Sequence, residues 1–151
     1  MLSRRHLLTG SLALAALGGL VAMGHRPVEG PDAQALTEAQ LATLVACFEC
    51  LLPEAGPAQE LAQGVDAFLV SDPFAAGELG MALSVLEHWG WTRFSRLSFE
   101  QRVDRLKAWE ASPVGLQRQI FQALRRTAVF SWFSGPKAWE AIGYDGPWVQ
   151  P

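Results

Sequence analysis

Hydrophobic residues recur at helical spacing along most of the chain after residue 36, and no useful length alternates between apolar and polar positions. Thr37 opens the first such segment, with Gln40 three residues later in the spacing of a capping box. The apolar side chains that follow fall on one stripe, and Pro53 ends it: Leu41, Leu44, Val45, Phe48, Leu51 and Leu52. We therefore predict a first helix between Thr37 and Pro53.

Four further helices are expected. The second helix is expected over residues 59–70, and the third over residues 76–89. The third places its bulkier apolar residues on its buried side: Leu79, Leu83, Leu86 and Trp89. Ser98 and Gln101 repeat the capping-box spacing and open the fourth, and Ser112-Pro113 opens the fifth, because proline suits the first helical position. The predicted fold class is all-α, an irregular bundle of about five helices.

The end of the fifth segment is apolar nearly all round, which predicts burial on more than one side: Val129, Phe130, Trp132 and Phe133. From Ser134 the chain is rich in glycine and proline, and we expect an extended C-terminal tail. Its large aromatics, Trp139, Tyr144 and Trp148, are costly to leave in water. The tail therefore either packs back on the bundle or lies on another protein.

The first residues have the pattern of an export signal. Arg4 and Arg5 precede an apolar stretch, 7–21, and the small residues Ala22 and Gly24 suit a signal peptidase. The paired arginines followed by two leucines resemble the twin-arginine motif. A transmembrane anchor is the alternative, but the stretch is shorter than the ~20 residues that a span needs. We expect a signal peptide over residues 1–24 and a helical domain over 25–151, with cleavage or retention of the signal left open.

Charge is unevenly distributed within a net charge of −3, which gives no general attraction to nucleic acid. Residues 27–91 contain ten acids and no Lys or Arg, whereas basic residues dominate 93–126. Two helical layers that attract each other would explain this split, and so would a polarised docking surface. We favour the first interpretation.

Cys47 and Cys50 form a C-x-x-C motif in the first helix. A c-type haem site would need histidine where Leu51 stands, and His88 alone cannot complete a zinc site. On a helical wheel Cys50 points away from the apolar stripe and Cys47 lies at its edge. The pair either forms a disulfide, with each other or with a partner, or remains unreacted. Catalytic redox use is the least favoured option, and His88 is expected to be a surface or hydrogen-bonded structural residue.

No phosphate-binding loop, nucleophile elbow or metalloprotease motif occurs in the sequence. We therefore expect no catalytic, cofactor-binding or metal-binding residues in this chain.

Three stretches together resemble the gluconate 2-dehydrogenase subunit 3 family, the small or gamma subunits of bacterial FAD-dependent sugar or alcohol dehydrogenases. They are Leu36-Thr37-Glu38-Ala39-Gln40-Leu41 leading to Leu51-Leu52-Pro53, then Gly64-Val65-Asp66-Ala67-Phe68-Leu69, and finally Trp132-Phe133-Ser134-Gly135-Pro136, Trp139 and Ile142-Gly143-Tyr144-Asp145-Gly146-Pro147. The last stretch is the most distinctive.

The resemblance implies a non-catalytic subunit that carries the twin-arginine signal for a large flavoprotein and assists its assembly. FAD would belong to the partner, a cytochrome c subunit would pass electrons on, and the complex would lie in the periplasm or at the outer face of the cytoplasmic membrane. We expect the partner to contact the aromatic residues near the C-terminus: Trp132, Phe133, Trp139, Tyr144 and Trp148. The alternatives are a free periplasmic thiol–disulfide protein using Cys47 and Cys50, and a binding domain unconnected with redox enzymes.

Overall fold

The computed structural model describes residues 33–143, and every regular element in that range is helical. The elements are α2 (Glu38–Leu51), α3 (Ala58–Leu69), α4 (Pro73–His88), the short 3₁₀ turn η1 (Phe94–Arg96), α5 (Phe99–Glu110), α6 (Gly115–Phe133) and α7 (Pro136–Ala141). The all-α prediction is confirmed. The expected signal peptide, with Arg4 and Arg5, and the aromatics Tyr144 and Trp148 lie outside the described residues.

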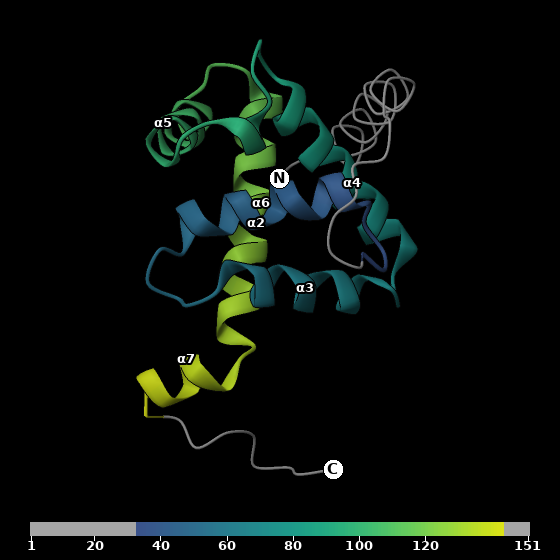
Figure 1. The fold of residues 1–151 in the computed structure, drawn as a ribbon, viewed down its shortest axis with the longest axis vertical. Helices are drawn as coiled ribbons and strands as arrows, with labels where there is room; N and C mark the ends of the chain where they lie inside the picture. Colours follow the sequence, from purple (N-terminus) through teal and green to yellow (C-terminus); the bar gives the residue numbers. More distant parts are fainter. Residues whose placement is uncertain (1–32, 144–151) are drawn as a thin grey trace, which may run out of the picture.

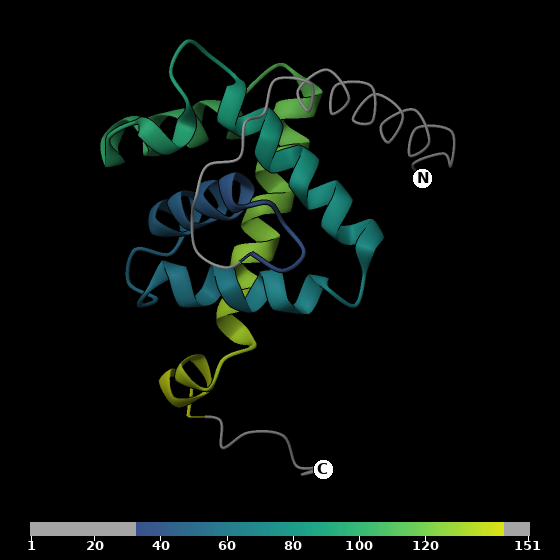
Figure 2. The ribbon, with the colours of Figure 1, turned by 45° about the vertical axis from the view of Figure 1, so that its right-hand side comes forward.

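The longest helix, α6, runs the length of the bundle, and α2 and α3 lie side by side across it (Figure 1). Helix α5 packs near the start of α6 and α7 lies at its end, while α4 covers the flank (Figure 2). Within residues 33–143, no helix is long and apolar enough to cross a membrane.

Helix α2 is the centre of the packing. The predicted capping box is present: the Thr37 hydroxyl accepts the Gln40 N–H at 3.3 Å, and the Gln40 side chain accepts the Thr37 N–H at 2.9 Å. Helices α3, α4, α5 and α6 all contact α2. More of its surface is therefore buried than one stripe predicts, and Cys47, expected at the edge, lies fully in the core.

Helix α4 begins at Pro73, three residues earlier than predicted, because Asp72 caps it. The Asp72 carboxylate accepts the Ala75 N–H at 3.0 Å, and Pro73 occupies the first turn, where a missing N–H costs nothing. The predicted capping box of Ser98 and Gln101 is present at the start of α5.

A buried carboxylate attaches the chain that enters the bundle to α3. Asp66 is 1% exposed, and it accepts the backbone N–H groups of Gln34, Ala35 and Leu36 at 2.6, 3.0 and 2.7 Å. Three donors to one charged acceptor satisfy a group that would otherwise be costly to bury. Asp66 therefore fixes where the N-terminal part of the chain meets the domain.

A second buried carboxylate, Glu87, joins α4 to α2 and to η1. It accepts the Thr43 hydroxyl at 3.1 Å, and the Ser95 N–H and hydroxyl at 2.9 and 2.7 Å. Among the described residues, one partly buried ion pair joins the acidic and basic parts of the sequence: Arg102 of α5 lies 2.6 Å from Glu49 of α2. This pair fits the interpretation of attraction between helices within the globule.

Candidate functional site

The cysteine pair lies near the end of α2, and both thiols are free in the structure. Burial raises the pKa of Cys47 well above its ordinary value; Cys50 and Glu87 add to the effect and Arg102 opposes it. Burial also raises the pKa of the half-buried Cys50 thiol, again against the influence of Arg102. A reactive thiolate needs a lowered pKa, so this environment favours two neutral thiols over a nucleophile.

His88 ends α4, and its Nδ1 lies 2.9 Å from the Ser84 carbonyl oxygen, as expected for a hydrogen-bonded structural histidine. Among residues 33–143, no three His, Cys, Asp or Glu side chains are grouped so that they could hold a metal ion.

The end of α6 differs from the prediction. Val129, Phe130 and Phe133 were expected to be buried on more than one side, but this is wrong: Phe130 is 58% and Phe133 is 50% exposed. The last turns of α6 pass α3 and lead into α7, beyond the reach of α2 and α5 (Figure 1). Helical periodicity identified the apolar faces but not the number of helices that cover them.

The chain after α6 turns into a short helix where an extended tail was predicted. Helix α7 starts at Pro136. Proline fits there because the first residues of a helix need no backbone N–H for a hydrogen bond within the helix. The Trp139 indole N–H donates to the Phe133 carbonyl at 2.8 Å and fixes the corner between the two helices.

This corner displays apolar side chains that we call the aromatic end: Trp132, Phe133, Trp139 and Ile142. Trp132 and Trp139 are half-buried, whereas Phe133 and Ile142 are exposed. Three of the five predicted contact residues are therefore brought together here, and Tyr144 and Trp148 lie outside the described residues.

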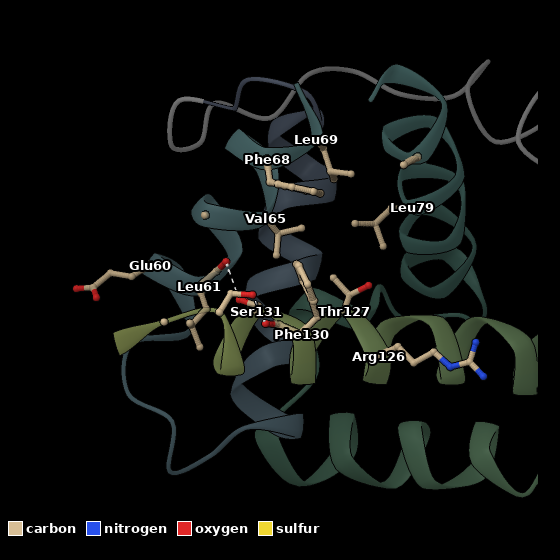
Figure 3. Close-up of a pocket in the computed structure, with 14 residues that line it drawn as sticks. Glu60, Leu61, Val65, Phe68, Leu69, Leu79, Arg126, Thr127, Phe130 and Ser131 are labelled. Atoms are coloured by element: carbon tan, nitrogen blue, oxygen red, sulfur yellow. Dashed lines mark hydrogen bonds between the residues drawn. The ribbon is translucent and has the colours of Figure 1, made fainter. Parts of the chain in front are cut away.

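A second apolar surface is a groove of about 730 Å³ between α3, the first half of α4 and the last turns of α6 (Figure 3). Its lining includes Leu61, Val65, Leu69, Ala75 and Leu79. The rings of Phe68 and Phe130, 6.1 Å apart between centroids, stand over it, and both are more than half exposed. Glu60 and Arg126 lie at its edges with their charged groups pointing outward (Figure 3). We call this surface the α3–α6 groove.

Sequence reasoning missed this groove, although a signal for it exists. On α3, Ala62, Asp66 and Leu69 face the core, and Leu61, Val65 and Phe68 form a second stripe beside them at spacings of four and three. An apolar arc of that width exceeds what one neighbouring helix covers.

The loop after α4 presents another exposed aromatic. Trp89, predicted on the buried side, is 40% exposed, and its ring meets the edge of Trp109 at 5.8 Å. Trp91 is fully exposed at the tip. The neighbouring Thr92 carbonyl accepts a hydrogen bond from Arg105 at 3.1 Å, which ties this loop to α5.

Comparisons with protein-family models, with curated proteins and with solved structures found no match to this chain. The functional argument therefore rests on its own residues: the paired arginines, the two buried thiols, the aromatic end and the α3–α6 groove.

Proposed function

We propose that this chain is the non-catalytic small subunit of a FAD-dependent dehydrogenase complex, and that it supplies the twin-arginine signal for its flavoprotein partner. In this proposal FAD and the oxidation of a sugar or alcohol belong to the large subunit. A cytochrome c subunit accepts the electrons, and the assembled complex works in the periplasm or at the outer face of the cytoplasmic membrane. The basis is the arginine pair, the family resemblance and the exposed aromatic end.

The aromatic end is the observation that carries the proposal. Large apolar side chains at the end of α6 and on α7 remain in water: Phe133 is 50% and Ile142 is 65% exposed. Each 100 Å² of apolar surface removed from water contributes roughly 2.5 kcal/mol, from which the entropic cost of association is subtracted. Tryptophan is also enriched among the residues that dominate interface energies. A large partner that covers Phe133 and Ile142 would gain this stabilisation.

The twin-arginine route exports folded proteins, so a signal on one subunit can serve a complex that has already assembled. This gives the small subunit a role that needs no reactive group of its own. The environment of Cys47 and Cys50 agrees with that role, because their raised pKa values disfavour the thiolate on which the thiol–disulfide alternative depends.

Conservative replacement of the arginine pair tests co-export. In cells that express both subunits, the double variant Arg4→Lys, Arg5→Lys should leave this chain and the flavoprotein in the cytoplasm, measured by fractionation and flavin content. Arg26→Lys is the matched control, because it changes a nearby arginine outside the motif and should leave export intact. Arrival of the flavoprotein in the periplasm with the double variant would contradict the proposal.

A further inference from the structure

The α3–α6 groove is an open, mostly apolar hollow in the surface of the described residues. Its 730 Å³ corresponds to roughly 24 water molecules at about 30 Å³ each. Water there would meet Phe68 and Phe130 and the aliphatic side chains beneath them. An exposed apolar surface of this kind usually marks a binding site for another segment or molecule.

We propose that the groove binds the chain's own export signal, so that the apolar stretch 7–21 lies in it in the folded precursor before translocation. This inference rests on the proposed function only in taking residues 1–24 as the signal. It assigns the groove to the signal and leaves the aromatic end to the partner.

The position at which the chain enters the domain supports this occupant. Asp66 holds the backbone of residues 34–36 against α3, and its neighbours on that helix, Val65 and Leu69, line the groove. The eleven residues 22–32 can extend over about 36 Å, whereas the twelve-residue α3 is about 18 Å long. The linker is therefore long enough for the apolar stretch to lie along the groove.

The length and composition of residues 7–21 also match the groove. Fifteen residues would form a helix of about 22 Å, close to the length of the α3 wall. Seven of those fifteen positions are Leu or Val, spread over the whole stretch: Leu7, Leu8, Leu12, Leu14, Leu17, Leu20 and Val21. The C-terminal residues 144–151 offer a much shorter apolar surface, which Tyr144, Trp148 and Val149 supply.

Charge also favours the export signal over residues 144–151 as the segment that binds in the groove. The wall formed by α3 and α4 contains acids and no Lys or Arg from residue 58 to residue 88, and Asp72 and Glu78 are exposed beside the lining residues Ala75 and Leu79. Arg4 and Arg5 would meet these acids favourably. Residues 144–151 carry Asp145 and no cation, and the single arginine of the lining, Arg126, lies on the opposite wall. The signal is therefore the better electrostatic match.

Binding of this kind would cover the signal's apolar stretch in the folded precursor. The translocation machinery would have to draw the signal out of the groove, and cleavage after Gly24 would leave the groove open in the mature chain. The aromatic end lies on α7 and the last turn of α6, and it adjoins the groove at Ser131 and Ser134.

Amide hydrogen exchange on the isolated full-length chain tests the inference. The amides of residues 7–21 should exchange at least about tenfold more slowly than in an unstructured peptide of the same sequence, which marks a segment held in a bound state. Phe130→Glu places a charge in the groove and should abolish that protection. Phe99→Glu, a matched change at an exposed phenylalanine on α5, should leave it intact. Protection of the α2 amides in every variant shows that the fold is retained.

Each alternative occupant of the groove predicts a different exchange result, and any of these results would overturn the inference. Exchange of residues 7–21 at the unstructured rate in the wild type would mean that the signal does not bind. Release of residues 144–151 by Phe130→Glu would identify the C-terminal tail as the occupant. Protection that disappears on dilution would place the segment on a second copy. The flavoprotein is absent from this experiment, so these failures are distinguishable from a failure of co-export, which is measured only with the partner present.

Discussion

Helix α2 and the end of α6 contain similar apolar residues and have opposite fates. Phe48 of α2 is fully buried among four helices, whereas Phe133 of α6 is half exposed with α7 as its neighbour. The difference arises from the number of elements that reach each site, because both segments are strongly apolar in sequence. One region therefore belongs to the folding core, and the other leaves apolar surface exposed.

Polar contacts follow the same division. Around α2 and α3 the buried carboxylates Asp66 and Glu87 bridge segments far apart in the sequence. At the end of α6 most polar contacts are local: the Ser134 hydroxyl donates to the Phe130 carbonyl at 2.7 Å, and the Trp139 indole donates to the Phe133 carbonyl. The Ser131 hydroxyl makes one longer-range bond, to the Leu61 carbonyl of α3 at 3.3 Å. These local bonds fix the shape of the aromatic end without covering it.

Phenylalanine truncation in the two regions should give the largest contrast. Phe48→Ala removes a fully buried ring and should lower the free energy of unfolding by about 3–5 kcal/mol. Phe133→Ala should lower it by less than about 1 kcal/mol, because half of that side chain is already in water. Urea denaturation measures both. Equal losses would mean that the aromatic end belongs to the folding core.

Neutralising a buried carboxylate should have the next largest effect. Asp66→Asn replaces one of the acceptor oxygens by a donor and weakens the bonds to residues 34–36, which should cost about 2 kcal/mol. Asp72→Asn is the matched control at the exposed cap of α4, where asparagine caps about as well and the change should stay below ~0.5 kcal/mol. If the two variants are equally stable in urea, Asp66 does not anchor the entering chain.

The pH dependence of stability should reveal the burial of Cys47. Its pKa is raised in the folded state, so its contribution to stability is complete below the ordinary thiol pKa of about 8.5 and is lost as the pH rises through the folded value. Above pH 8.5 the wild type should lose up to about 1.4 kcal/mol per pH unit more than Cys47→Ala. Cys50→Ala should change the slope less, because Cys50 is only half-buried. Parallel curves for the wild type and Cys47→Ala would contradict a raised pKa.

Local features of the fold could be predicted from the sequence. The capping boxes at Thr37 and Ser98 depend on residues three positions apart, and both helix starts were predicted correctly. The start of α7 was missed because Gly135-Pro136 is compatible with a turn and with a first helical turn. Contacts with the rest of the bundle decide between the turn and the helix, and those contacts cannot be read from the sequence.

Features that depend on distant parts of the chain could not be predicted. The core position of Cys47 and the exposure of Phe130 follow from how many helices surround each residue. The role of Asp66 depends on backbone groups about thirty residues away. Residues of the aromatic end, such as Trp132 and Trp139, were predicted as contact residues from the sequence, whereas the α3–α6 groove became visible only in the fold.

Affinity purification of the chain from periplasmic extract is the most direct test of the claim that the aromatic end binds a flavoprotein. We predict that the wild type and Phe99→Ala each bring down one large FAD-containing polypeptide, measured by flavin absorbance. Phe133→Ala should retain at least about tenfold less, with its thermal midpoint almost unchanged. If no flavin follows the wild-type chain, or if Phe133→Ala retains the full amount, the aromatic end is not the partner-binding surface.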